Sequence, residues 1–317
     1  MARILIVTPA AAGSRTGNRH TAARWSAMLR SKGHRVAVAT EWKGQRCDLL
    51  IALHARYSHP SVRRYRDANP SAPLVVALTG TDLYRDLPDS ALARESLALA
   101  DRLIVLQEQA LRSLPKKFRA KSRVVYQSSG ARQRHSPPSR PFRLAVVGHL
   151  RKVKDPFRAV RAVSHLEGDY EVVQLGSALD PRMAPVARRW MKREPRYRWL
   201  GSLPHASALA WIARSHLLVV SSEMEGGANV VCEAARIGTP VLASRVAGNV
   251  GMLGAKYPGY YRLFDDRGLA RLIGRCREDS AFAGKLKKKL GSRKKLFAPE
   301  AERRALLAAL RGLVIPA

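Results

Sequence analysis

Short apolar runs alternate with amphipathic segments along the first half of the chain. The apolar runs predict strands, and segments with apolar residues at helical spacing predict helices between them. The predicted strands are Arg3–Thr8, Val36–Thr40, Asp48–Leu53, Leu74–Leu78, Arg102–Leu106 and Arg123–Gln127. The predicted helices are Asn18–Lys32, Pro60–Ala68, Ser90–Ala100 and Glu108–Leu114. Strands that alternate with helices indicate βαβ units around a parallel sheet.

The same alternation starts again after a polar, proline-rich segment, residues 132–141. Strands are predicted at Phe142–Val147, Tyr170–Leu175, Tyr197–Leu200, Leu217–Val220 and Pro240–Ser244. Helices are predicted at Asp155–His165, Arg182–Lys192, Ser207–Arg214, from about Ala228 onward, and at Glu300–Leu313. The fold class is therefore α/β, with two doubly wound, Rossmann-like domains that face each other across a cleft.

The expected boundaries follow from this pattern. Residues 1–131 form the first domain, 132–141 the linker and 142–298 the second domain, and 299–317 carry a helix that packs on a domain surface. A chain of 317 residues has room for two domains with a core each. No apolar run approaches the roughly 20 residues of a membrane-spanning helix.

Charge and cysteine content narrow the function classes. The formal net charge is +33, but the arginines are spread along the chain rather than clustered. This distribution favours a generally basic protein that attracts small anions over a dedicated nucleic-acid binder. The basic run Lys285–Lys295 is interpreted as a solvated helix end, although it could also bind anionic lipid or nucleic acid. Three scattered cysteines without a paired spacing favour a reducing, cytoplasmic location.

The most informative segment is residues 221–244, SSEMEGGANVVCEAARIGTPVLAS. Glu225 and Glu233 stand eight positions apart, and the glycine-rich turn Gly226-Gly227-Ala228-Asn229 leads into an apolar helix. A strand, a glycine turn and a helix together aim backbone N–H groups at one point, where a phosphate binds favourably. Glutamates beside that point can accept hydrogen bonds from sugar hydroxyls, so the pattern indicates a nucleotide-sugar site.

A second candidate segment is VVGHLRKVKD, which follows the first strand of the second domain. Gly148 ends the strand, His149 can donate a hydrogen bond, and Arg151 and Lys154 supply cations. This is the position at which doubly wound domains bind phosphates.

The first domain contributes candidates for the other substrate. The segment Gly13–His20 joins the first strand to its helix and carries Arg15, Gly17, Asn18, Arg19 and His20. Thr79 and Asp82 follow another strand, and Asp82 is expected either as a general base or as a helix cap. His54 ends a further strand and is expected near the same place. No Asp-x-Asp pair is present to hold a metal–diphosphate, so no metal and no cofactor are expected.

These motifs resemble those of a known family. The segment EGGANVVCE resembles the E-x7-E motif of GT-B retaining glycosyltransferases of the family-4 type, and VVGHLRKVKD resembles their diphosphate loop. Through GNRHTAARW and TGTDLYRDL the chain is most similar to one subgroup, the selenosugar synthases of selenoneine biosynthesis. His149 stands where the family usually has arginine, and Thr79 stands where it commonly has histidine.

The resemblance implies roles for individual residues. Glu225 and the backbone of Gly226 and Gly227 would hold the donor hexose, Glu233 would bind the ribose hydroxyls, and Lys154 would bind the diphosphate. Arg151 would supply the cation that is missing at His149. Gly148, His149, Ala228 and Asn229 complete the expected donor site. From their positions in the first domain, Arg15, Gly17, Asn18, Arg19, His20 and Thr79 are expected to bind the acceptor. The expected catalytic residues are Glu225, Arg19, His20 and Asp82.

The reaction that the resemblance implies is transfer of a hexosyl group from a UDP-sugar, such as UDP-N-acetylglucosamine, to selenophosphate. The products would be a 1-selenosugar, UDP and phosphate. Two other classes stay open: a conventional GT-B enzyme with a hydroxyl acceptor, and a nucleic-acid-binding or sugar-binding protein on the same scaffold. The expected partners are the two small substrates, with no specific nucleic acid and no integral membrane contact.

Overall fold

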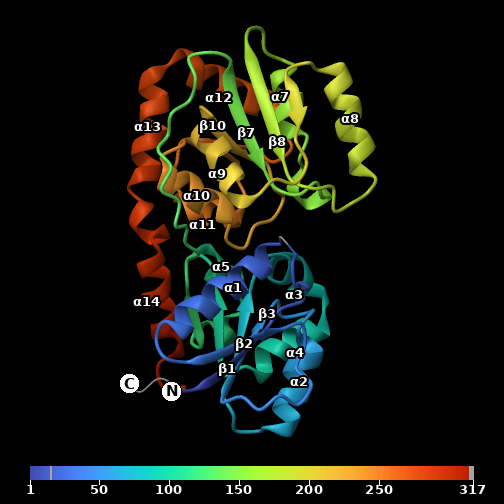
Figure 1. The fold of residues 1–317 in the computed structure, drawn as a ribbon, viewed down its shortest axis with the longest axis vertical. Helices are drawn as coiled ribbons and strands as arrows, with labels where there is room; N and C mark the ends of the chain where they lie inside the picture. Colours follow the sequence, from blue (N-terminus) through green and yellow to red (C-terminus); the bar gives the residue numbers. More distant parts are fainter. Residues whose placement is uncertain (15, 314–317) are drawn as a thin grey trace. The chain divides into compact units, whose positions relative to one another are not determined.

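Two compact units make up the part of the chain that the computed structural model describes, residues 1–14 and 16–313. Of the described residues, those within 1–127, 225–227 and 299–313 form the first unit, and those within 128–224 and 228–298 form the second. Each unit contains one sheet with helices around it (Figure 1). No helix among the described residues is both long and apolar enough to cross a membrane.

The first unit is built on a six-stranded parallel sheet in the order β2-β1-β3-β4-β5-β6. Its strands are β1 (Arg3–Val7), β2 (Arg35–Ala39), β3 (Leu49–Leu53), β4 (Leu74–Leu78), β5 (Arg102–Val105) and β6 (Ser122–Val124). Its helices are α1 (Gly17–Arg30), α2 (His59–Ala68), the π-helix η1 (Asp82–Asp86), α3 (Leu87–Asp89), α4 (Ala91–Leu99), α5 (Gln109–Ser113), α6 (Lys116–Arg119) and α14 (Pro299–Leu310).

Alternate residues of the central strands enter two separate hydrophobic cores. Leu50 and Val76 belong to the core beneath α2 and α4, whereas Ile51 and Val75 belong to the core beneath α1 and α14. Successive strand residues point to opposite faces of a sheet, and helices bury both faces here. This explains why β3 and β4 are apolar at every position.

The second unit repeats this plan with the order β12-β11-β10-β7-β8-β9. Its strands are β7 (Phe142–Val147), β8 (Tyr170–Leu175), β9 (Tyr197–Trp199), β10 (Leu217–Val220), β11 (Val241–Ser244) and β12 (Tyr260–Tyr261), all parallel. Its helices are η2 (Lys152–Lys154), α7 (Arg158–Val163), α8 (Met183–Arg193), α9 (His205–Ala213), α10 (Asn229–Ile237), α11 (Ala247–Leu253), α12 (Asp266–Glu278), α13 (Ser280–Gly291) and η3 (Lys294–Phe297). Two doubly wound α/β sheets are thus present, which confirms the predicted fold class.

The predicted elements agree with the structure where the apolar pattern is strong. Strands β4, β7, β8 and β10 have the predicted bounds, and α10 begins at Asn229, directly after the predicted start. The strand expected at Arg123–Gln127 is β6 at Ser122–Val124, and the final helix begins at Pro299. The predictions missed the longer helices α11 and α12 and the short elements η1, α3, α6, η2, η3 and β12, and they recognised α13 only as a helix end in the basic run.

A buried acid, Glu302, attaches helix α14 to the first unit. The side chain of Glu302 is 0% exposed and accepts hydrogen bonds from Arg24 Nε (2.6 Å) and Trp25 Nε1 (2.8 Å) of α1. Leu306 and Leu310 pack into the same core as Trp25. The carboxylate therefore joins α14 to α1 and accepts hydrogen bonds from two donors that would otherwise lack this partner.

Replacing Glu302 by leucine should lower the free energy of unfolding by about 3 kcal/mol, because Arg24 and Trp25 then lose their acceptor inside the core. Urea denaturation measures the change. The matched variant Glu300→Leu alters an exposed acid of the same helix and should stay within about 0.5 kcal/mol of the parent. Equal stability of the two variants would show that the buried acid does not hold α14.

Candidate functional site

The amino end of α10 follows directly from the carboxyl end of β10 through residues 221–228. Ala228 is the N-cap in an extended conformation, and no described side chain caps the helix. The first turn contains no acid. The backbone N–H groups of this turn, beginning with Asn229 and Val230, carry the positive end of the helix dipole. Such a helix start favours an anion.

Glu233 lies one turn inside α10 and is held in place by a histidine. Its side chain is 12% exposed, and Oε1 accepts a hydrogen bond of 2.8 Å from His205 Nε2 at the start of α9. A carboxylate offers about four lone-pair positions, so Glu233 can still accept from a ligand. The sequence analysis missed His205, since nothing in the segment around it signals a contact with a residue 28 positions away.

The loop after β7 is tied to the loop after β10. Ser221 Oγ donates to the carbonyl oxygens of Lys154 (3.0 Å) and Asp155 (2.7 Å), and the N–H of Glu223 donates to Val153 O (2.9 Å). The predicted diphosphate loop, with Arg151 and Lys154, is thus fixed beside the residues that lead into α10. Both loops lie at the carboxyl ends of neighbouring parallel strands, where doubly wound domains bind ligands.

His149 is oriented by the next loop of the same sheet. Its Nδ1 is hydrogen-bonded to Ser177 Oγ (2.8 Å), and the N–H of Leu150 donates to Ser177 O (2.9 Å). Gly148 likewise donates its N–H to Leu175 O (2.8 Å). The residues after β7 therefore continue the pairing with β8 before the chain turns into η2.

Residues Glu225–Gly227 belong to the first unit because their backbone lies directly against it. A Cβ atom on Gly226 would overlap the carbonyl oxygen of Thr79, and one on Gly227 would lie 2.8 Å from Leu106 Cβ. Gly80 has φ of +136°, a conformation that favours glycine, and its own Cβ would lie 2.8 Å from Gly226 N. The glycines are thus needed for close backbone contact, which places Glu225, a buried side chain, next to Thr79.

Asp82 is fully buried, which corrects the expectation of a general base. Its carboxylate accepts hydrogen bonds from the backbone N–H groups of Thr79 (2.9 Å), Gly80 (2.8 Å), Leu83 (3.1 Å) and Ala55 (3.0 Å). Both oxygens are therefore occupied in shaping the loop after β4. It does not cap a regular helix either, since η1 begins at Asp82 itself. Asp82 positions Thr79 and Gly80 rather than touching a substrate.

His54 is also buried rather than open to a ligand. It is 3% exposed, its Nδ1 accepts from the N–H of Tyr57 (3.3 Å), and its Nε2 is 3.1 Å from Thr81 Oγ1. Its ring stacks on Tyr57, with centroids 4.3 Å apart. The sequence predicts His54 near the other candidates of the first domain, but its side chain is buried and its polar contacts with the described residues are internal.

The predicted acceptor residues lie at the amino end of α1, directly after the loop that follows β1. Gly17, Asn18, Arg19 and His20 form the first turn of this helix, and Arg15 lies outside the described residues. Thr16 is the N-cap, and no described side chain caps the helix. The first turn contains no acid, so its N–H groups and Arg19 together favour an anion. No group of three or more His, Cys, Asp or Glu side chains that could hold a metal ion occurs among the described residues.

Comparisons with known proteins bear on the family and the fold. Residues 127–295 match the family model described as "Glycosyl transferases group 1". The chain is similar in fold to Alr3699/HepE from Anabaena, solved in complex with UDP-glucose, with a TM-score of 0.79 at 15% identity over 98% of this chain and 99% of that one. It is also similar to sucrose-phosphate synthase from Thermosynechococcus elongatus, with a TM-score of 0.80 at 17% identity over 99% of both chains.

Replacing Asp82 by asparagine should destabilise the protein, because an amide cannot accept hydrogen bonds through both of its polar atoms. We expect the free energy of unfolding to fall by about 2 kcal/mol, since buried N–H groups lose an acceptor. Thermal or urea denaturation measures this. Asp89→Asn, an exposed acid nearby, serves as the control and should have little effect. If the Asp82→Asn protein kept the parental stability but lost its turnover, the result would support a catalytic role for Asp82 instead.

Proposed function

Because the chain belongs to the family of group 1 glycosyl transferases, we propose that it transfers a hexosyl group from a UDP-sugar to selenophosphate. The observation that carries the donor half is the uncapped amino end of α10, with the cationic loop of Arg151 and Lys154 fixed beside it. UDP-glucose bound to a protein of similar fold supports the choice of donor.

The donor's parts match the chemistry of the surrounding residues. The diphosphate accepts hydrogen bonds from the first-turn N–H groups of α10, and Arg151 and Lys154 offset its charge. Glu233, held by His205, accepts hydrogen bonds from the ribose hydroxyls. Glu225 and the backbone of Gly226 and Gly227 hold the hexose. In this arrangement cations and the helix dipole stabilise the leaving diphosphate without a metal ion.

The acceptor proposal rests on the first unit and on the resemblance to selenosugar synthases. The uncapped amino end of α1, with Arg19 and His20 in its first turn, favours an anionic acceptor over a neutral one. Asp82 and His54 are engaged internally, so neither is placed to deprotonate a hydroxyl. Selenium in selenophosphate is already anionic and attacks without a strong general base.

Selenium forms a bond to the anomeric carbon as the bond from that carbon to the UDP oxygen breaks. Water then cleaves the selenium–phosphorus bond, which gives phosphate and the 1-selenosugar. UDP carries away the electron pair of the broken carbon–oxygen bond.

The acceptor is tested by incubating the full chain and UDP-N-acetylglucosamine with selenophosphate, or with simple sugar alcohols, and weighing the products by mass spectrometry. A selenosugar with stoichiometric UDP release is the expected result. Glycosides of the alcohols without a selenosugar would replace the proposal by a conventional hydroxyl acceptor. Salt-dependent binding of DNA or RNA with no UDP release would show that the protein binds nucleic acid and is not a transferase.

Two substitutions separate the roles of the two glutamates. Glu233→Ala should weaken UDP binding about tenfold, because the ribose loses a charged acceptor. Glu225→Ala should leave UDP affinity within about twofold and lower the transfer rate, since it holds the hexose rather than the nucleotide. Calorimetry with UDP and a UDP-release assay provide the two readouts.

Glu278→Ala removes an exposed acid of α12 in the second unit and is the matched control. It should leave both UDP affinity and turnover unchanged. Parental UDP affinity and turnover in the Glu233→Ala and Glu225→Ala proteins would contradict the donor site.

A further inference from the structure

A pocket of about 580 Å³ lies in the second unit at the amino ends of its strands. Phe142 and Leu217, which line it, are the first residues of β7 and β10, and Asp169 and Pro240 directly precede β8 and β11. The candidate donor loops follow β7 and β10 at their carboxyl ends. All strands of this sheet are parallel, so the pocket and the donor loops lie at opposite edges of it. The pocket is a separate site.

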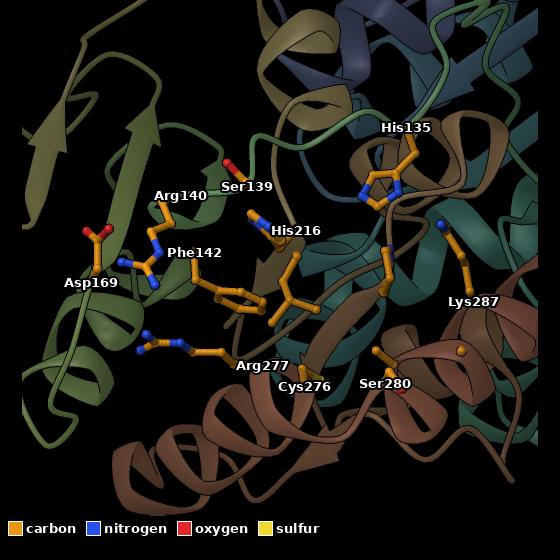
Figure 2. A pocket seen from close by; sticks show the side chains of 14 residues that line it. His135, Ser139, Arg140, Phe142, Asp169, His216, Cys276, Arg277, Ser280 and Lys287 are labelled. Atoms are coloured by element: carbon orange, nitrogen blue, oxygen red, sulfur yellow. The ribbon is translucent and has the colours of Figure 1, made fainter.

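Positive charge dominates the lining of this pocket. Arg140, Arg277 and Lys287 line it together with a single carboxylate, Asp169. Figure 2 shows Arg140 and Arg277 on one side of Phe142, and Lys287 on the other side near His135. Among the described residues, none of the ion pairs involves any of the three cations. Arg277 packs over the ring of Tyr170, 4.6 Å from its centroid, which leaves its positive charge without an acidic partner. The charge of the three side chains can therefore attract an anion that enters the pocket.

The middle of the pocket is a flat, uncharged wall. The rings of Phe142 and His216 stack with centroids 4.4 Å apart and an interplanar angle of 26°. His216 Nδ1 accepts from the N–H of Arg143 (2.9 Å), and burial with the nearby charge of Arg143 lowers the pKa of His216. Burial, with Lys287 nearby, lowers the pKa of His135 to about 4. Both imidazoles are therefore neutral at pH 7, and the ring pair offers a surface for an apolar or aromatic group.

Helix α13 leaves room for a ligand. Ser280, Ala283, Gly284 and Lys287 line the pocket from one face of this helix, at the spacing that a helical face requires. A Cβ atom on Gly284 would meet no atom within 4 Å, so open space lies above it. Small residues at 283 and 284 thus create the hollow, and the cation at 287 lies one turn further along.

We propose that this pocket binds a small phosphorylated molecule that carries a ring. The phosphate is recognised by the unpaired cations, and the ring packs on the Phe142–His216 pair. The volume falls within the roughly 300–1,000 Å³ that is usual for small-molecule sites. The site is independent of the proposed transfer reaction, since none of its lining residues belongs to the donor or acceptor groups described above.

The test is a titration of the full chain, labelled with ¹⁵N, with phenyl phosphate. The readout is the ring resonances of His135 and His216, which report on this pocket and not on the donor loops. We expect saturable shifts of these resonances. Inorganic phosphate should bind several-fold more weakly, because it lacks the ring that packs on the aromatic wall.

Matched variants assign the binding to the pocket. Lys287→Gln and Arg140→Gln should each weaken phenyl phosphate about tenfold, whereas Lys288→Gln, an exposed lysine of the same helix, should not change its affinity. Gly284→Leu should abolish binding by filling the hollow. Gly284→Ala leaves most of the space open and should still bind, which controls for any effect of removing the glycine from the helix.

The same phosphate chemistry could be presented by a soluble metabolite or by a lipid headgroup. Sedimentation with phosphatidylcholine vesicles that contain phosphatidic acid separates these sources. Vesicle binding by the parent protein that Gly284→Leu removes identifies a lipid headgroup. If the parent protein binds phenyl phosphate but does not sediment with the vesicles through this pocket, the ligand is a soluble metabolite. Resonances of His135 and His216 that stay unchanged at millimolar phenyl phosphate would overturn the proposal. Equal affinity of the Gly284→Leu and Gly284→Ala proteins would do the same.

Discussion

The candidate donor site depends on one electrostatic feature, a helix that begins without a cap. Every helix leaves its first N–H groups without partners inside the helix, and side chains, water or ligands satisfy them. Ser90, Asp265 and Asp279 do this for α4, α12 and α13, whereas other helices of this chain, α1 and α9 among them, begin without a cap from a described side chain. At α10 no described side chain does so, although the helix follows directly from a buried strand. This terminus is therefore a candidate anion-binding position, and the donor site proposed above is centred on it.

Contacts within each unit fix other groups of the candidate site. The hydroxyl of Ser221 ties the loop after β7 to the loop before α10, which fixes the cations of η2 nearby. His205 fixes the carboxylate of Glu233. In the first unit, Asp82 shapes the Thr79–Gly80 turn against which the backbone of Gly226 lies. These contacts hold the loops and side chains of the candidate site in fixed positions.

The sequence predicted the two sheets and the start of α10 because apolar periodicity and glycine spacing are local signals. It did not predict the pairing of Glu233 with His205 or of Glu302 with Trp25, since each joins residues far apart in the chain. The role of Asp82 was misjudged for a related reason. In the sequence, a carboxylate that follows a strand gives the same pattern whether its side chain faces solvent or accepts from four backbone N–H groups. Only the burial of Asp82 in the structure distinguishes the two cases. The pocket beside α13 combines the linker with two helices, and no single segment signals it.

The central claim is that the leaving diphosphate binds at the amino end of α10. A crystal structure of the full chain with UDP tests it most directly. The account predicts diphosphate oxygens within hydrogen-bonding distance of the N–H groups of Asn229 and Val230, with the ribose hydroxyls against Glu233. UDP bound elsewhere, with these N–H groups facing only water, would contradict it.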